Sequence, residues 1–553
     1  MKDKLTLKWL YGCSKKHLPQ IFFLSVMRSA LTVLNVLFAL SSKYIVDAAV
    51  SGNQKALFSS AGVLLLIIVS KILIRILGQS LELTVTARLN MHIRGSFFSN
   101  ILKRDYSALS LYHSGDLLTR LSDDVSLISE GIVALIPSAI SLIVGLVYAF
   151  YSIAKLDLPF AFIFLVGGVI LFGALSLFKS ITKKLHKNVQ EAEGKVRSFY
   201  QEALASILMV KVFSIEDTIS KKGNEFQSGH ISAVLKRRTL SIFASGSLGL
   251  VFSIGSLFAL VRSAYRLYAG TITFGTLTAI LQLVNQIQSP FASLSGLLAS
   301  YYSLLASAER IIEVETLPEE DGETPALDAA ASYSKLESIC FDNVTFGYKD
   351  DEPVLKNANL SIKKGDFAVI GGISGIGKST FIKLLLGVFP PQSGRINLVI
   401  DGKTIPAGKH SRPLFSYVPQ GNLLLSGTIR ETVSVVRKGL SDQDIMRAAE
   451  ISCAAEFIDR LPKGLDTYIG EKGAGLSEGQ AQRLAIMRAI LSDAPIILLD
   501  EATSALDEET EARLLNNLRG MHDKTCIIIS HKPAAFEICN KHIFIEDKSI
   551  KVE

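Results

Sequence analysis

Six long apolar runs occupy the part of the chain before Ser307, and they restrict the possible fold more than any other feature of the sequence. The hydrocarbon core of a bilayer is about 30 Å thick, so a helix needs about 20 largely apolar residues to cross it. The sequence therefore predicts six membrane-spanning helices, at residues 21–49, 56–77, 132–154, 158–178, 240–265 and 274–298. An even number of spans leaves both ends of this region on one side of the membrane.

The loops between these runs predict the orientation of the helices. The connections at 47–55, 155–159 and 268–275 are short and carry little charge, whereas the loops at 82–131 and 179–239 are long and rich in Lys and Arg. Basic residues accumulate in cytoplasmic loops. We therefore expect a multi-pass protein of the cell membrane whose long loops, two termini and remaining chain are cytoplasmic.

Charge and cysteine content exclude several other classes of protein. The chain has a net charge of +7, but its basic residues crowd into loop stretches such as KSITKKLHKNVQ, so we expect no nucleic acid partner. The five cysteines show no CxxC spacing, which predicts neither a disulfide framework nor a zinc site.

Several cations fall within or near the predicted spans: Arg28, Lys43, Lys71, Arg75 and Arg262. Two interpretations remain open for them. Charged groups inside a membrane often mark a transport pathway, and a basic cavity would favour an anionic or acidic-faced cargo. Alternatively, helix tilt and snorkelling place these side chains at the membrane interface or below it.

The rest of the chain has the mixed texture of an α/β domain. An acidic segment, PEEDGETPALDAAASYSK, has no apolar periodicity and is typical of a linker. We assign residues 1–314 to a transmembrane domain, 315–335 to the linker and 336–553 to a soluble domain. The expected fold class is multi-domain, with an all-α membrane domain followed by an α/β domain.

A glycine-rich turn in DFAVIGGISGIGKSTFIKLLLG lies between an apolar strand and an amphipathic helix, and it fits GxxxxGK[ST]. Such a turn closes backbone N–H groups around phosphates, and the helix directs its positive end at them. Lys378 would reach the β- and γ-phosphate oxygens, and Ser379 could bind Mg²⁺. The setting favours nucleotide binding over a purely structural loop. The predicted nucleotide-binding residues are Gly372, Ser374, Gly375, Ile376, Gly377, Lys378, Ser379 and Thr380.

Two further strands are expected to deliver side chains to the edge where this turn lies. APIILLDEATSALD places Asp500 and Glu501 at the carboxyl end of one strand, and TCIIIS is followed by His531. Asp500 is suited to hold Mg²⁺ through water, and Glu501 to orient an attacking water. His531 is a candidate sensor of the γ-phosphate.

Together these motifs resemble those of an exporter-type ABC transporter, a half-transporter in which six transmembrane helices are fused to one nucleotide-binding domain. The resemblance covers essentially the whole chain and implies an ATPase domain with a β subdomain and a helical subdomain. It implies that Tyr348 in FGY stacks on adenine and that Gln420 in SYVPQ links Mg²⁺ to the membrane domain. It also implies that Lys378, Glu501 and His531 are the catalytic residues.

The same resemblance assigns motifs that act between chains. The signature motif, which would contact ATP held by a partner chain, is Leu476, Ser477, Glu478, Gly479 and Gln480. The D-loop runs from Ser504 to Asp507, and Glu471 resembles the residue that faces the coupling helices. Residues 115–125 and 209–218 resemble the two coupling regions.

Two positions depart from the family's pattern. The signature reads LSEGQ where LSGGQ is usual, and Lys532 follows the switch histidine where arginine is usual. Glu478 suits the positive end of the following helix, and its side chain can point away from the nucleotide. The alternative is that Glu478 repels ATP and slows the site.

The resemblance implies a dimer, with a second identical or different half-transporter, that binds two ATP molecules with Mg²⁺ and exports a substrate by alternating access. A peptide or a hydrophobic or amphipathic small molecule is the favoured cargo, and membrane lipid is an expected partner. Two alternatives remain: a lipid flippase, and a membrane-anchored regulatory ATPase that moves no cargo. A regulatory protein would be expected to lack a catalytic element, and every one is present in this sequence.

Overall fold

The computed structural model describes residues 2–163, 166–167, 179–320, 324–349, 352–421, 424–470, 473–521 and 523–553. The chain forms two compact units. The first contains Met1–Ser99 and Ser114–Glu315, and the second contains Asn100–His113 and Thr316–Glu553. A helical half and a half built on β-sheets thus follow one another, as the sequence predicted.

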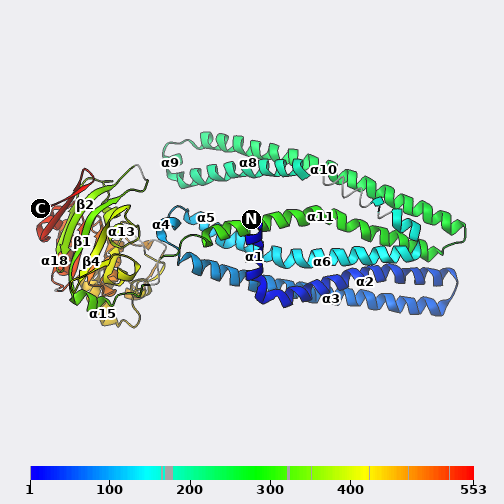
Figure 1. Ribbon diagram of the computed structural model, residues 1–553, viewed down its shortest axis with the longest axis horizontal. Helices are drawn as coiled ribbons and strands as arrows, with labels where there is room; N and C mark the ends of the chain where they lie inside the picture. Colours follow the sequence, from blue (N-terminus) through cyan, green and yellow to red (C-terminus); the bar gives the residue numbers. More distant parts are fainter. Residues whose placement is uncertain are drawn as a thin grey trace. The chain divides into compact units, whose positions relative to one another are not determined.

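The first unit consists of helices, several of which run far beyond the length that a bilayer needs (Figure 1). The longest is α10, with 53 residues, where about 20 suffice to cross the hydrocarbon core. The described helices are α1 (Lys2–Ser14), η1 (Lys15–His17), α2 (Leu18–Val50), α3 (Gln54–Ile101), α5 (Ser114–Thr119), η2 (Arg120–Asp124), α6 (Val125–Leu156), α8 (Lys179–Ala205), α9 (Ile207–Val212), α10 (Glu216–Tyr268) and α11 (Phe274–Glu315).

Four stretches of the described chain are long and apolar enough to cross a membrane: Lys4–Val50, Gln54–Ile101, Ser114–Leu156 and Glu216–Tyr268. They contain four of the six predicted spans and confirm a multi-pass helical region. The predicted span at 158–178 lies largely outside the described residues. The predicted span at 274–298 falls within α11, where the side chains of 289–295 are not described. The number six therefore stays a prediction.

Close packing joins the central helices of this unit. Helix α6 packs against α2 and α11, and α8 lies along α10 (Figure 1). Gly275 lies in the first turn of α11 beside α2, where a Cβ atom would lie 2.2 Å from the carbonyl oxygen of Lys43. Asp47 accepts a hydrogen bond from the Gly275 amide at 2.8 Å and one from the Thr273 hydroxyl at 2.9 Å. Glycine is thus required where these two helices meet.

Buried ion pairs join the π-helix η2 to α11. Asp124 is 1% exposed and accepts hydrogen bonds from the Ser307 hydroxyl at 2.9 Å and from the Arg310 guanidinium. Arg120, which is also buried, forms ion pairs with Asp116 at 3.0 Å and Glu313 at 2.9 Å. The chain segment that precedes α6 is therefore fixed to the end of α11.

A six-stranded sheet forms the centre of the second unit. Its strand order is β12-β11-β3-β10-β9-β6, and every neighbouring pair is parallel except β11 with β12. The strands are β3 (Phe367–Gly371), β6 (Phe415–Val418), β9 (Ile496–Asp500), β10 (Thr525–Ile529), β11 (Lys541–Glu546) and β12 (Ser549–Val552). Strands β3, β9 and β10 are buried at every residue, as expected for a parallel sheet covered on both faces.

An antiparallel sheet with the order β2-β1-β4-β5 packs against this centre. Its strands are β1 (Leu336–Phe346), β2 (Leu355–Lys363), β4 (Ser393–Ile400) and β5 (Lys403–Pro406), and a two-stranded sheet pairs β7 (Gly427–Thr428) with β8 (Tyr468–Ile469). Phe341 of β1 stacks on Phe381, with ring centroids 4.5 Å apart, which joins the two larger sheets through one apolar core.

Helices complete the second unit, and α15 and α17 belong to an apolar cluster that also includes side chains of the six-stranded sheet. The helices are α4 (Tyr106–Leu109), α12 (Ala329–Ser334), α13 (Lys378–Leu385), η3 (Lys409–Leu414), α14 (Ile429–Ser434), α15 (Asp442–Ile451), α16 (Ala455–Asp459), η4 (Gly464–Asp466), α17 (Glu478–Leu491), α18 (Glu508–Arg519) and α19 (Pro533–Ile538). The β and helical subdomains that the resemblance implied are both present.

Segment Asn100–His113 of the helical half belongs to the second unit. The Asp105 amide donates to the Pro318 carbonyl at 3.0 Å, and Arg104 donates to the Leu317 carbonyl at 2.7 Å. The segment immediately before residues 115–125, which resemble a coupling region, is thus the one that packs with the ATPase unit. The start of the predicted linker is accordingly paired with another segment and is not a free tether.

Candidate active site

The glycine-rich turn connects β3 to α13 and adopts backbone angles that side chains disfavour. Gly372, Gly375 and Gly377 have φ values of 142°, 81° and 111°. A Cβ atom at Gly377 would lie 2.3 Å from Val354 Cγ1, and one at Gly372 would lie 2.8 Å from the carbonyl oxygen of Ile545. The spacing in the sequence is therefore a steric requirement of this turn, which leads into the N-terminus of α13.

Lys378 lies at the start of α13 and is 4% exposed. Its ammonium donates to the carbonyl oxygens of Gly372 at 2.9 Å and Ile373 at 3.1 Å, and it lies 2.9 Å from His531 Nε2. Burial lowers the pKa of Lys378, while the carboxylates of Glu501 and Asp500 act in the opposite direction. The turn thus holds a cation over its own backbone, beside the predicted histidine.

The parallel sheet explains why the predicted residues converge. Strands β3, β10, β9 and β6 are neighbours, so their carboxyl ends share one edge of the sheet. That edge receives the glycine turn after β3, His531 after β10, Glu501 after β9 and Gln420 after β6. The sequence predicted that the turn, Glu501 and His531 lie at this edge, and the structure adds Gln420 to it.

Asp500 ends β9, is 1% exposed and has two hydroxyl partners. Ser379 Oγ donates to Asp500 Oδ1 at 3.0 Å, and Tyr417 Oη donates to Oδ2 at 3.1 Å. Burial raises the pKa of Asp500, and the two hydrogen bonds oppose that shift. The sequence analysis did not assign Tyr417 to the site. Its position in a strand three residues before Gln420 was the available signal.

Glu501 follows with φ of 51°, in the left-handed region that non-glycine residues rarely adopt. Gln420 Nε2 donates to Glu501 Oε2 at 2.6 Å, and His531 Nε2 lies 3.7 Å from Oε1. The side chains of Gln420 and His531 therefore face one carboxylate, from the loops after β6 and β10.

Hard divalent cations take oxygen ligands, and the donor set at this edge fits one. Ser379 supplies a hydroxyl and Asp500 supplies a carboxylate. Burial disfavours the charged form of Asp500, and a cation bound nearby would stabilise that form. The side-chain oxygen of Gln420 is a third potential ligand within the same group of side chains.

Tyr348 is exposed at the rim of the turn, with 56% of its surface accessible. Its hydroxyl lies 3.0 Å from Thr380 Oγ1, and its ring packs edge-on against Phe346 and Phe389. One flat face is therefore held in a fixed orientation, which is compatible with the predicted stacking on adenine. Ser374 is exposed in the turn, and Ile376 packs into the core beneath it.

The signature residues form the start of α17. Ser477 caps the helix, because its hydroxyl accepts from the Gln480 amide at 3.3 Å and Gln480 Oε1 accepts from the Ser477 amide at 2.9 Å. Leu476 packs against the helical cluster, and the side chain of Glu478 is exposed in the first turn. Glu471, the predicted coupling residue, lies outside the described residues.

The D-loop packs directly on the signature motif. A Cβ atom at Gly479 would lie 3.0 Å from the carbonyl oxygen of Ala505. Gln482 Nε2 donates to Ser504 Oγ at 3.0 Å and Gln482 Oε1 accepts from the Ala505 amide at 3.1 Å. Asp507 caps α18 by accepting from the Thr510 amide at 2.8 Å, which lowers the pKa of its carboxyl. Gln482 was not assigned from the sequence.

The cations of the helical half largely have partners within the protein. Arg28 Nη2 donates to both carboxylate oxygens of Glu82 at 2.7 Å, and Arg262 forms a two-pronged ion pair with Asp157 at 3.0 and 3.1 Å. Lys71 lies over the Phe38 ring at 5.2 Å, Lys43 lies over the Tyr44 ring at 5.9 Å, and Arg75 is exposed. These contacts favour a structural role for Arg28 and Arg262 over a role in a cargo cavity.

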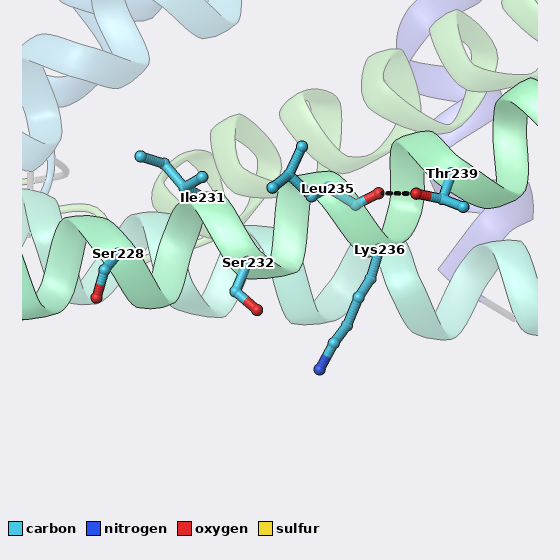
Figure 2. Close-up of a pocket in the computed structure, with 6 residues that line it drawn as sticks. All are labelled: Ser228, Ile231, Ser232, Leu235, Lys236 and Thr239. Carbon is cyan, nitrogen blue, oxygen red and sulfur yellow. Dashed lines mark hydrogen bonds between the residues drawn. The ribbon is translucent and has the colours of Figure 1, made fainter.

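A groove of about 580 Å³ lies on α10. It is lined by Ser228, Ile231, Ser232, Leu235, Lys236 and Thr239, all from one helix (Figure 2). Figure 2 shows Ile231 and Leu235 on one side of the helix and Lys236 pointing to the other. No catalytic group lines the groove.

Two family models match this chain. The model described as the ABC transporter transmembrane region matches residues 21–291, and the one described as ABC transporter matches residues 355–504.

Relatives and a solved structure agree with these matches. A putative multidrug export ATP-binding/permease protein of Staphylococcus aureus strain NCTC 8325 / PS 47 is 31% identical over 447 residues, which are 79% of this chain and 75% of that protein. The corresponding protein of the bovine strain RF122 / ET3-1 is 30% identical over the same length. The structure of a bacterial Atm1-family ABC exporter with ATP bound has a TM-score of 0.83 at 23% identity, over 97% of this chain and 94% of that one.

Proposed function

This chain belongs to the ABC transporter family, and we propose from that premise that it is an ATP-driven exporter of hydrophobic or amphipathic small molecules. The observation that carries the proposal is the convergence of Lys378, Glu501 and His531 at the carboxyl edge of one parallel sheet. A cation and a carboxylate that both lie beside one imidazole suit hydrolysis of a phosphoanhydride better than nucleotide binding alone.

Each residue has a chemical task in this proposal. Lys378 exchanges its two carbonyl partners for phosphate oxygens, Glu501 orients and polarises the attacking water, and His531 contacts the γ-phosphate. Ser379, Asp500 and Gln420 would hold Mg²⁺, which when bound neutralises charge on the transferred phosphoryl group. The exposed face of Tyr348 takes the adenine ring.

The working unit is a dimer of half-transporters, homomeric or heteromeric, with two ATP sites. The start of α17 supports this, because Ser477, Gly479 and the first amides of the helix form an end that can bind an anion. ATP bound at the glycine turn of the same chain is not expected to occupy that end. The motifs from Ser477 to Gln480 and the D-loop from Ser504 to Asp507 then meet the partner's nucleotide. The termini and the ATPase unit lie in the cytoplasm, as the loop charges predict.

A small amphipathic cargo is supported by the named role of the relatives, which are putative multidrug exporters. Arg28 and Arg262 are ion-paired within the protein, so an anionic cargo has less support.

The test uses the full-length chain in lipid vesicles whose ATPase units face outward. Glu501→Gln should lower kcat for ATP hydrolysis by about 10²- to 10⁴-fold and abolish ATP-dependent uptake of ethidium. Glu509→Gln, which changes an exposed acid of α18, should leave both unchanged and serves as the matched control.

Three outcomes would overturn parts of the proposal. Normal ATP turnover in Glu501→Gln would remove Glu501 from its role. Movement of a fluorescent phosphatidylcholine without movement of ethidium would identify a lipid flippase. ATP hydrolysis without movement of either probe would overturn the export of small amphipathic molecules and would leave a peptide exporter or a regulatory ATPase.

A further inference from the structure

The loops that follow β9 and β10 carry the two groups that would act on the γ-phosphate, Glu501 and His531. Glu501 has a left-handed backbone with φ of 51°. A glutamate keeps such a conformation only where its surroundings enforce it. Contacts made by these two loops must therefore hold the Glu501 backbone in place.

Backbone hydrogen bonds provide part of that restraint. The Glu501 amide donates to the Ile529 carbonyl at 3.1 Å, at the end of β10, and the Ser504 amide donates to the Glu501 carbonyl at 3.2 Å. The Leu506 amide donates to the Thr503 carbonyl at 3.1 Å, which closes a tight turn from Thr503 to Leu506. The conformation of Glu501 is thus coupled to the position of this turn.

Lys532, the residue after His531, fastens the turn from the other loop. Its ammonium donates to the carbonyl oxygens of Thr503 at 3.0 Å and Leu506 at 2.5 Å, the two ends of the turn. It also forms an ion pair with Glu511 Oε2 at 3.3 Å, and Glu511 is fully buried. The Thr503 hydroxyl donates to Glu511 Oε1 at 2.7 Å, so the charged pair and the turn form one network.

The opposite side of the turn is held by α17. Gln482 contacts Ser504 and the Ala505 amide, and Gly479 allows the backbone of Ala505 to approach the helix. The turn is therefore held between the helix that begins with the signature motif and the loop that carries His531. Lys532 supplies the only ammonium in this network among the residues that the structure describes.

We propose that Lys532 is a positioning residue for ATP hydrolysis, which holds Glu501 in its left-handed conformation and at a set distance from His531. It acts through Thr503, Leu506 and Glu511 and touches no substrate. Without it, the turn relaxes and the Glu501 carboxylate leaves the place where it faces Gln420 and His531. This proposal rests on the roles proposed above for Glu501 and His531.

Lys532→Met tests the proposal in the full-length chain reconstituted in lipid. It should lower kcat by up to about a hundredfold, since a displacement of about 1 Å at a reacting group has an effect of that size, and should leave KM for ATP within about threefold. Lys532→Arg should retain kcat within about threefold, because guanidinium can donate to both carbonyls and to the carboxylate.

Lys524→Met is the matched control. Lys524 precedes β10 and donates to the carbonyl oxygens of Asp493 at 3.1 Å and Ala494 at 3.0 Å, and to the Asp493 carboxylate at 3.4 Å. It makes the same kinds of contact at the opposite end of the same strand. We expect Lys524→Met to leave kcat unchanged.

Lys532→Met/Glu511→Gln separates positioning from folding, because it removes the buried carboxylate that the single variant leaves unpaired. The double variant should regain thermal stability while kcat stays low. Normal kcat in Lys532→Met, or recovery of kcat together with stability in the double variant, would overturn the proposal. If Glu501→Gln loses activity and Lys532→Met keeps full activity, only the proposal for Lys532 is wrong. If Glu501→Gln keeps full activity, the proposed function is wrong.

Discussion

Each half of the molecule contains an aspartate that is 1% exposed, and the two are held in different ways. In the helical half, Asp124 is paired with the Arg310 guanidinium and accepts from Ser307. In the ATPase half, Asp500 accepts from the hydroxyls of Ser379 and Tyr417. Among the residues that the structure describes, no Lys or Arg forms an ion pair with Asp500.

The difference separates a structural carboxylate from a functional one. A buried charge is tolerated when a partner of opposite charge and further hydrogen bonds compensate it, as at Asp124. Asp500 forms no ion pair with a Lys or Arg among the described residues, and burial raises the pKa of its carboxyl. A site that is incompletely compensated within the protein is one that a divalent cation can complete.

Other acids of the helical half follow the structural pattern. Asp157 is paired with Arg262 and with Arg266 at 2.8 Å, and Glu82 is paired with Arg28. Charges in this half therefore join helices to one another. In the ATPase half, the charged groups Lys378, Asp500 and Glu501 are instead gathered at the edge of the sheet.

The largest expected effect comes from breaking the paired aspartate. Arg310→Met leaves Asp124 buried without its cation, so it should destabilise the helical half by about 3 kcal/mol. Arg310→Met/Asp124→Asn should recover most of that loss. Thermal unfolding of the full-length chain in detergent checks both variants. Equal stability of the single variant and the unchanged protein would mean that Arg310 does not compensate Asp124.

A smaller effect of opposite sign is expected at the unpaired aspartate. Because burial makes the charged form of Asp500 unfavourable in the folded protein, Asp500→Asn should stabilise the ATPase half by roughly 1 kcal/mol at neutral pH while abolishing ATP hydrolysis. Thermal unfolding in EDTA, compared with ATPase assays, measures the two effects. A loss of stability would show that Asp500 is a structural carboxylate like Asp124.

The smallest effect is expected at an acid that is neither buried nor paired. Glu478 is exposed in the first turn of α17, where solvent screens its charge. Glu478→Gly should therefore change KM for ATP and kcat by less than about threefold. Glu478→Gln, which keeps the side chain length, is the control for altered helix stability. A several-fold rise in turnover in both variants would support repulsion of ATP by Glu478.

Much of the ATPase site could be predicted because its determinants are local. The glycine turn, the strand before it and the helix after it are contiguous in the sequence, and parallel strands bring their carboxyl ends to one edge. Lys378, Asp500, Glu501 and His531 were placed at that edge by this reasoning alone, and they lie there in the structure. Tyr417 and Gln482 were not assigned, because a hydrogen bond between distant segments leaves no periodic signal.

The ion pairs of the cations in the helical half could not be predicted either. The presence of these cations in apolar runs was evident, but whether they are paired depends on helix neighbours more than 50 residues away, as with Arg28 and Glu82. The departure at Lys532 was evident too, and its partners Thr503, Leu506 and Glu511 were not.

The sequence by itself determined the family, the membrane-spanning character of the first half and the identity of the phosphate-binding loop, since these follow from apolar length and from contiguous motifs. Only the tertiary structure decided which buried charges are compensated, how Glu501 is held in a left-handed conformation and which side chains restrain it. The reason is physical: burial and ion pairing are properties of atoms brought together from distant segments, and one segment read alone does not contain them.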